Sequence, residues 1–202
     1  MTRDPYTPPA AAVVDRPPDD ARDAPFFVVS PTKVVALSIC TLGVYQLFWF
    51  YMHWRRWRVG RSETVWPVAR AIFALFYVHA LERRIGRTLE ARALARHRGT
   101  FAAATVYLVL TALDIGSALA WPWISYRIPA GWWWAAEWSS LLLVLPVTAA
   151  MCVLQGAANA ACGDPDARSN LRFTIYNAAW MLGGVSLTGW VLYMELAAGA
   201  VG

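Results

Sequence analysis

The sequence is poor in charged residues. Asp, Glu, Lys and Arg together make up 15% of its 202 residues, whereas a typical soluble domain has about 25%. Hydrophobic residues make up 58%, compared with about 45–50% in a soluble domain. So little charge and so much apolar surface favour an integral membrane protein over a soluble domain.

Cysteine and histidine are few, and their spacing fits none of the usual metal or redox sites. The three cysteines form no paired motif, and the three histidines lie on different segments of the chain. A metal site needs several donors that converge, and a redox site needs paired cysteines. The glycine-rich stretch 183–189 lacks the lysine of a nucleotide-binding loop, and its glycines are better explained by close helix packing. We therefore predict no catalytic residue, no metal site and no cofactor.

The first 32 residues are polar and rich in proline, alanine and aspartate. Such a segment buries too little apolar surface to fold, so residues 1–32 are predicted to form a disordered tail. The tail lacks the apolar region of a signal peptide. Ser30 followed by Pro31 is typical of a helix start, with Ser as the N-cap and Pro in the first turn. Residues 33–202 are predicted to form a transmembrane helical domain.

Long runs without charge dominate that domain. Val34 to Tyr51 is a run of eighteen uncharged residues, equivalent to about 27 Å of helix and close to the thickness of a bilayer core. The second run is shorter and contains Arg70, so it either spans the membrane or re-enters. We predict an all-α fold, a polytopic transmembrane helical bundle with four or five spans. Its predicted segments are 33–52, 66–81, 101–121, 132–155 and 176–196.

The basic residues between these segments indicate the orientation, because Lys and Arg mark cytoplasmic loops. Regions 82–100 and 156–175 are predicted to be cytoplasmic and the C-terminus external, whether the second segment spans or re-enters. The N-terminus differs between the two alternatives: it is inside with five spans and outside with a re-entrant second segment. The predicted location is the bacterial cytoplasmic (inner) membrane, with several passes.

Aromatic rings and arginines are mixed between residues 41 and 58 (TLGVYQLFWFYMHWRRWR). Such a mixture is typical either of a strip that binds nucleic acid or of a helix end at the lipid headgroups. These rings continue an uncharged span, which favours the headgroups, so membrane lipids are the predicted partner and nucleic acid is not. The lipid-headgroup candidates are Trp54, Arg55, Arg56, Trp57 and Arg58.

One carboxylate lies deep inside a predicted span. Asp114 is the fourteenth residue of the segment 101–121. A charge at such a depth costs about 2.5–3.5 kcal/mol on insertion scales, so it should face the bundle and find a partner. Arg70 is the predicted partner, because it is the other mid-segment charge and has the opposite sign. The pair either handles protons or ions or has a purely structural role.

Other polar side chains receive structural interpretations. His79 and Glu82 share a helix face and are predicted to form a hydrogen-bonded pair. Asp164 is predicted to cap a helix start. Gln155 and Asn159 are predicted to hydrogen-bond between helices.

Three stretches resemble one known family. SPTKVVALSICTLGVYQLFWFYMHWRRWR is similar to the opening motif of the bacterial domain-of-unknown-function family 4234, with its Ser-Pro start, Thr-Leu-Gly-x-Tyr sequence and aromatic run into Trp and basic residues. Residues 67–85 and 164–184 resemble two later elements of that family, whereas the middle of the chain, with Asp114, does not. The resemblance implies an uncharacterised bacterial integral membrane protein, with no assigned activity.

The predicted function is that of a non-enzymatic inner-membrane protein that acts through helix packing, lipid contacts or partner contacts, with a homo-oligomer or another membrane protein as possible partner. The alternative is a small transporter or channel component that uses the intramembrane carboxylate of Asp114. A membrane enzyme is disfavoured, because no nucleophile, base and orienting group converge in the sequence.

Overall fold

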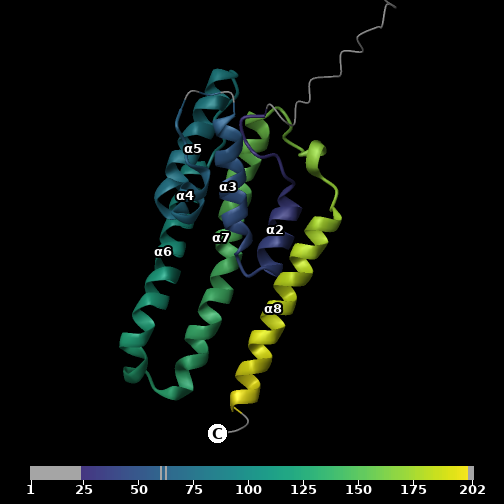
Figure 1. The fold of residues 1–202 in the computed structure, drawn as a ribbon. Coiled ribbons are helices and arrows are strands. Elements are labelled where there is room, and N and C mark those ends of the chain that lie inside the picture. Colours follow the sequence, from purple (N-terminus) through teal and green to yellow (C-terminus); the bar gives the residue numbers. More distant parts are fainter. Residues whose placement is uncertain (1–23, 60, 62, 200–202) are drawn as a thin grey trace, which may run out of the picture.

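The structure, a computed structural model, describes residues 24–59, 61 and 63–199, and all the regular structure in these ranges is helical (Figure 1). The predicted all-α class is therefore confirmed. Short 3₁₀ turns η1 (Ser125–Arg127), η2 (Ala130–Trp132) and η3 (Arg168–Asn170) join the longer elements. The described residues form seven α-helices: α2 (Pro31–Cys40), α3 (Tyr45–Arg58), α4 (Pro67–Ile72), α5 (Ala74–Ala91), α6 (Thr100–Ile124), α7 (Trp133–Ala161) and α8 (Ile175–Gly199).

The helices form two tiers (Figure 1). The long helices α6, α7 and α8 run through both tiers, while α2, α3, α4 and α5 lie around the upper part in that view. Helix α6 packs on α5 and α7, α2 packs on α7 and α8, and α3 packs on α4. The connection between α6 and α7 lies at the lower end, and the connection between α7 and α8 lies at the upper end.

The first predicted span is wrong, because residues 33–52 do not form one continuous helix. Helix α2 ends at Cys40, and α3 begins at Tyr45 and returns to the upper end (Figure 1). Leu42 and Gly43 between them have φ of 47° and 86°, a left-handed conformation that glycine adopts easily. The Gly43 N–H donates to Ser38 O at 2.8 Å, which closes the end of α2. The two helices form a hairpin, residues 31–58, whose tip lies halfway down the bundle.

The second predicted segment, 66–81, is also divided. Helix α4 ends at Ile72, and α5 starts at Ala74 and continues into the arginine-rich region as far as Ala91. Together they join the upper end of α3 to the upper end of α6 (Figure 1). The three later segments have nearly the predicted bounds, and each is a single long helix.

Part of the predicted tail is folded. Residues 1–23 lie outside the described residues, but the stretch 24–30 packs against the bundle, with Phe26 fully buried and Val29 almost so. The predicted helix start is confirmed, since the Ser30 hydroxyl accepts the Lys33 N–H at 3.3 Å and Pro31 begins α2. The tail boundary at residue 32 is therefore wrong, because the apolar run FFVV, residues 26–29, finds a core to enter.

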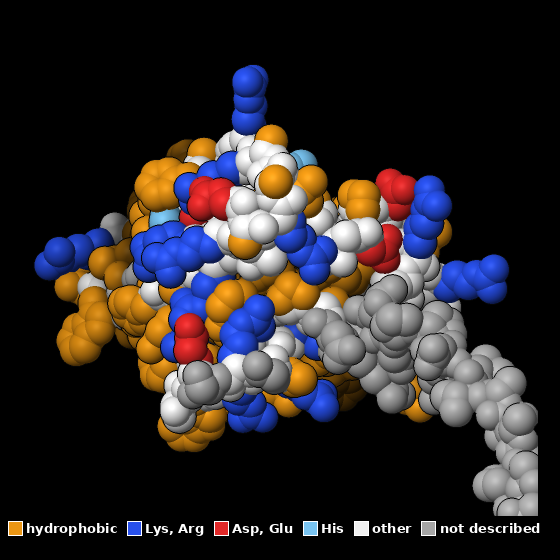
Figure 2. All heavy atoms as spheres, turned by 90° about the horizontal axis from the view of Figure 1, so that it is seen from above, with side chains coloured by type: hydrophobic (Ala, Val, Ile, Leu, Met, Phe, Trp, Pro, Cys, Tyr) orange, Lys and Arg blue, Asp and Glu red, His pale blue; other side chains and the backbone are white. Residues whose placement is uncertain are grey.

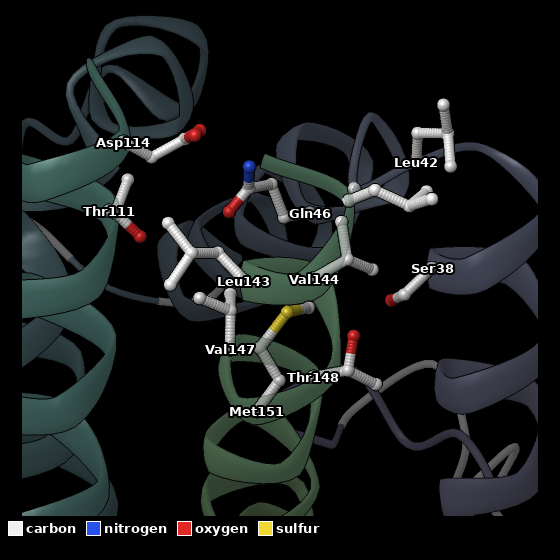
Figure 3. Close-up of a pocket in the computed structure, with 12 residues that line it drawn as sticks. Ser38, Leu42, Gln46, Thr111, Asp114, Leu143, Val144, Val147, Thr148 and Met151 are labelled. Atoms are coloured by element: carbon white, nitrogen blue, oxygen red, sulfur yellow. The ribbon is translucent and has the colours of Figure 1, made fainter. Parts of the chain in front are cut away.

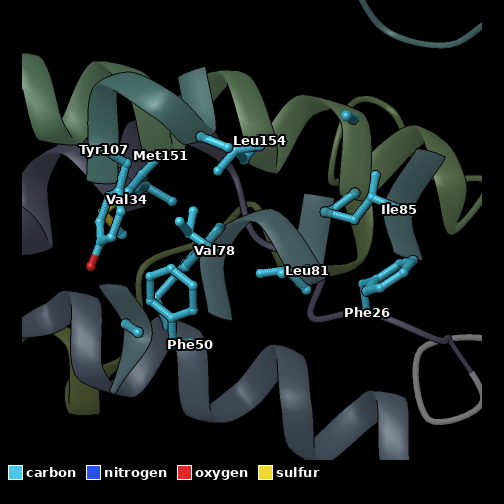
Figure 4. Packing of buried hydrophobic residues seen from close by; sticks show 14 of the residues in the cluster. Phe26, Val34, Phe50, Val78, Leu81, Ile85, Tyr107, Met151 and Leu154 are labelled. Atoms are coloured by element: carbon cyan, nitrogen blue, oxygen red, sulfur yellow. The ribbon is translucent and has the colours of Figure 1, made fainter. Parts of the chain in front are cut away.

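The core lies between the helices of the upper tier, and Figure 4 shows several of its buried side chains packed together. It is rich in rings: Trp49, Phe50 and Trp54 of α3 are fully buried, and Tyr107 of α6 packs against Phe50 with ring centroids 5.2 Å apart. The lower parts of the long helices instead expose large apolar side chains. Examples are Leu113, Leu119, Trp123, Leu142, Leu145, Leu187 and Trp190. Exposed apolar surface on this scale indicates contact with lipid or with another protein.

Two described helical stretches are long and apolar enough to cross a membrane: Thr100–Arg127 and Leu141–Ala161. Their length and composition support the prediction of a membrane protein at its coarsest level. By length and composition, the described residues contain two candidate spans, fewer than the four or five predicted.

Candidate functional site

A cavity of about 170 Å³ lies where the tip of the α2–α3 hairpin meets α6 and α7 (Figure 3). Polar side chains from four helices line it among apolar ones: Ser38, Gln46, Thr111, Asp114 and Thr148. Figure 3 shows Asp114 and Gln46 facing each other across the space. Asp114 therefore faces the bundle, as its predicted depth requires.

Local structure explains how these groups meet. Thr111 and Asp114 are three residues apart on α6 and so share one face of that helix. The break after Cys40 lets Gln46, in the first turn of α3, approach the same face. The Tyr107 hydroxyl donates to Gln46 Oε1 at 2.7 Å, which orients the amide. The cavity thus depends on the hairpin, and a continuous first span would not form it.

One hydroxyl of the cavity lacks a partner in the described part of the chain. Ser38 Oγ is buried and has no hydrogen-bond partner there, whereas the Thr111 hydroxyl lies next to the Tyr107 hydroxyl. Leaving a buried polar group unpaired costs about 1–3 kcal/mol, so Ser38 favours a bound group that supplies contacts. All the polar ligands that Ser38, Thr111 and Asp114 offer are oxygens, which suit a hard cation.

Arg70 does not pair with Asp114, so that prediction is wrong. Its guanidinium lies over the rings of Trp54, at 4.3 Å from Cζ to the ring centroid, and Tyr77, at 5.1 Å. None of the ion pairs among the described residues joins Arg70 to Asp114. The physical reason is the aromatic core, which offers the guanidinium two ring faces close to its own helix.

The aromatic run is largely core rather than a headgroup belt. Trp54 is fully buried, and Trp57 stacks on Phe26 with ring centroids 5.4 Å apart. Trp57 Nε1 also donates to Glu63 Oε2 at 3.2 Å. The two rings therefore pack in the core and form no exposed belt, because their face of α3 lies against its neighbours. Their predicted role as headgroup contacts stays a prediction. The lipid role of the three neighbouring arginines stays a prediction: Arg55 and Arg58 are exposed, and Arg56 is half-buried.

A buried polar network holds the upper tier together. Gln155 Oε1 accepts from Trp49 Nε1, and His53 Nε2 lies 3.2 Å from the same oxygen. Gln155 Nε2 donates to Phe27 O at 2.9 Å, and Asn159 Nδ2 donates to Val29 O at 3.0 Å. Burial lowers the pKa of His53 to about 3, so its ring is neutral. The predicted hydrogen bond between helices is confirmed for Gln155, which joins α7 to α3. Asn159 instead bonds to Val29 in the stretch 24–30 and to Gln155 on its own helix.

Glu82 has other partners than the predicted one. Its Oε1 accepts from Arg96 Nη2 and from the Thr100 hydroxyl, both at 2.8 Å, whereas His79 Nε2 lies 3.2 Å from Thr105 Oγ1. The predicted pair of His79 and Glu82 is therefore wrong. The loop that follows α5 folds back over the helix and supplies the arginine, and spacing along one helix does not predict such a contact.

Asp164 caps a turn, although a shorter one than predicted. Its carboxylate accepts the backbone N–H groups of Arg168 at 2.8 Å and Ser169 at 2.9 Å, at the start of η3. Partial burial raises the pKa of Asp164, but the hydrogen bonds from Ser169 and Arg168 together lower it by more. The pKa of Asp164 is therefore below its usual value. No group of three His, Cys, Asp or Glu side chains among the described residues is arranged to hold a metal ion.

No family model, no curated protein and no solved structure matches the chain. The resemblance to family 4234 stays a prediction.

Proposed function

We propose that the chain is a bacterial inner-membrane protein that crosses the bilayer three times, through α6, α7 and α8. These helices contain no Lys or Arg, and their lower parts expose apolar side chains to the surroundings. In this proposal the α2–α3 hairpin and the α4–α5 segment enter the membrane and leave on the same side. Three spans then replace the four or five expected from hydropathy.

Charge supports one orientation of these spans. The connection at the lower end contains a single basic residue, Arg127. The other described Lys and Arg residues lie in 24–98 and 162–174, which belong to the upper tier, and Figure 2 looks onto that end and shows basic side chains spread over it. Because basic residues mark the cytoplasmic side, the upper end is cytoplasmic in this proposal and the C-terminus is external.

The cavity favours the transport alternative over a role in packing alone. With α6 spanning, Asp114 lies near the middle of the bilayer, next to a non-helical hairpin tip. Irregular backbone at such a depth occurs where it lines a cavity, and broken helices of this kind bind substrates and ions in transporters. Among the described residues that line the cavity, Asp114 is the only carboxylate, and one carboxylate balances one positive charge. We therefore infer that the cavity holds a monovalent cation or a proton, as part of a small transporter or channel.

The orientation has a direct test by cysteine labelling. In a variant whose three native cysteines are replaced by alanine, single cysteines are introduced as Arg61→Cys, Glu90→Cys and Pro129→Cys. We expect a membrane-impermeant maleimide to label only Pro129→Cys in intact cells, and all three after permeabilisation. External labelling of Arg61→Cys would restore the model with five spans, and external labelling of Glu90→Cys would contradict both.

The ion site is tested with Asp114→Asn. We expect Na⁺ or K⁺, but not the bulky N-methylglucamine ion, to raise the melting temperature of the purified protein. A ligand at 100 times its Kd stabilises the folded state by about 2.7 kcal/mol. Asp114→Asn should abolish this gain. Ser117→Ala is the matched control, because Ser117 is exposed one turn away on the same helix and does not line the cavity.

A proton site would behave differently in the same assay. The melting temperature of the wild type would then depend on pH and not on the cation, and Asp114→Asn would remove that dependence. Uptake measurements in proteoliposomes distinguish a transporter from a static site. A wild type that responds to neither cation nor pH, or an Asp114→Asn variant that responds like the wild type, would refute the proposed function.

A further inference from the structure

Two arginines from different helices lie over one buried tryptophan. Arg70 of α4 has its Cζ 4.3 Å from the Trp54 ring centroid, and Arg84 of α5 has its Cζ 5.1 Å from the same centroid. Trp54 is fully buried in the core of the upper tier. We call Trp54, Arg70 and Arg84 the arginine–tryptophan cluster.

The positive charge of this cluster is only partly balanced. Arg84 forms an ion pair with Glu63 at 2.9 Å, but the Glu63 side chain is 50% exposed, so water weakens that pair. Arg70 has ring contacts but no ion pair or hydrogen bond within the described ranges. Burial, and then the charge of Arg84, lowers the pKa of Arg70. Two neighbouring guanidiniums therefore share one solvated carboxylate.

Each member of the cluster also has an unused donor. Trp54 Nε1, Arg70 Nη1 and Arg84 Nε are buried and have no hydrogen-bond acceptor in the part of the chain that the structure describes. Buried donors are normally paired. A group with several acceptor oxygens and a negative charge would supply what all three lack.

The surroundings of the cluster indicate where such a group comes from. Large apolar side chains on and beside α4 point outward: Trp66 is 72% exposed and Phe76 is 73% exposed. Ile72 and Phe73, between them, are exposed as well. A basic cluster next to an exposed apolar face is the arrangement that meets phosphate headgroups and acyl chains together.

We propose that the arginine–tryptophan cluster binds a phosphate group, and that this phosphate is the headgroup of an anionic membrane phospholipid. The planar guanidinium matches two phosphate oxygens at once, which a lysine does not. The phosphate site itself does not depend on the cation proposed above. In the orientation proposed above, the lipid would belong to the cytoplasmic leaflet, and that part of the inference rests on the proposed function.

The test is native mass spectrometry of the purified protein with added lipid. The variant Arg70→Gln/Arg84→Gln is compared with Arg83→Gln/Arg87→Gln, which removes the same charge from exposed positions of α5. We expect the first variant to lose about tenfold or more in affinity for phosphatidylglycerol, and the second to lose little. Phosphatidylcholine, with its compensating choline, should bind weakly to all three proteins.

Helix content and a melting curve without lipid establish that the double variant is folded. If it is not, Arg70→Lys keeps the charge and loses the two-pronged geometry, and Trp54→Phe keeps a ring and removes the indole donor. Either change should weaken phosphatidylglycerol binding by several-fold. Asp114→Asn should bind the lipid normally, so that failure of the lipid site and failure of the cation site are separate results.

Inorganic phosphate distinguishes the two sources of the ligand. If it raises the melting temperature of the wild type but not of Arg70→Gln/Arg84→Gln, and lipid does not bind, the site is right and the lipid assignment is overturned. Equal losses in the two double variants would overturn the cluster as a specific site. Unchanged lipid binding in Arg70→Gln/Arg84→Gln would overturn it as well.

Discussion

Replacing Gln155 with leucine is expected to cost about 3–5 kcal/mol of stability, enough to unfold the upper tier. Gln155 is fully buried, and its amide joins two helices and an extended stretch: Oε1 accepts from Trp49, and Nε2 donates to Phe27 O at 2.9 Å and to Asn159 Oδ1 at 2.7 Å. Leucine would leave Trp49 Nε1 and Phe27 O without these partners, at about 1–3 kcal/mol for each group, whereas Asn159 Oδ1 still accepts the Val29 N–H at 3.3 Å.

The measurement is equilibrium unfolding in mild detergent, followed by circular dichroism. Val153→Ala is the control, because Val153 lies on the same helix but is partly exposed, so its loss should cost less than about 1 kcal/mol. A Gln155→Leu protein within 1 kcal/mol of the wild type would mean that the network contributes specificity rather than stability.

This network explains why the sequence alone does not predict the start of the fold. The run FFVV, residues 26–29, lies in a segment dominated by proline and aspartate. The mean composition of the whole segment does not reveal such a short apolar run. Its carbonyl oxygens accept hydrogen bonds from side-chain amides in distant parts of the chain. The donors are Gln155 to Phe27 O, Asn170 to Val28 O and Asn159 to Val29 O. Contacts across 128 to 142 residues leave no local signal.

Helix positions followed from the sequence where one physical effect dominates. The segments 101–121, 132–155 and 176–196 are uncharged over most of their length, and each coincides with a long helix. The first segment is equally apolar, yet it is a hairpin, because hydropathy does not distinguish one long helix from two short ones. The sequence Thr41-Leu42-Gly43 is what marks the break between the two helices. Gly43 allows a left-handed backbone, and the Thr41 hydroxyl accepts the Tyr45 N–H at 3.0 Å.

The candidate site was half predictable for the same reason. Burial cost pointed to Asp114 as a residue that faces the bundle, and it does line the cavity. Its neighbours Ser38 and Gln46 meet it only because of the hairpin, which hydropathy does not predict. Charge alone favours Arg70 as the partner, whereas ring faces close to its own helix decide its position.

Two adjacent glycines of α8 are expected to respond to the same substitution in opposite directions. A Cβ added at Gly184 would lie 2.9 Å from the Cys40 carbonyl carbon and from Thr41 Cα, and closer still to the Cys40 carbonyl oxygen. These are backbone atoms at the hairpin tip, so a change of side-chain rotamer cannot relieve the clash. Gly183 has open space at the same position. The predicted role of these glycines in close packing therefore holds for Gly184.

Gly184→Ala should destabilise the protein by about 1–3 kcal/mol or more, the usual range for overpacking, because α8 must move away from the tip. Gly183→Ala should be neutral or stabilising by up to about 1 kcal/mol, since alanine favours helix more than glycine does. Thermal unfolding of the two variants in the same detergent measures the difference. Because the tip also lines the cavity, Gly184→Ala should reduce the stabilisation by Na⁺ or K⁺ while Gly183→Ala preserves it. Equal melting temperatures for the two variants would mean that α8 does not pack on the hairpin at this point.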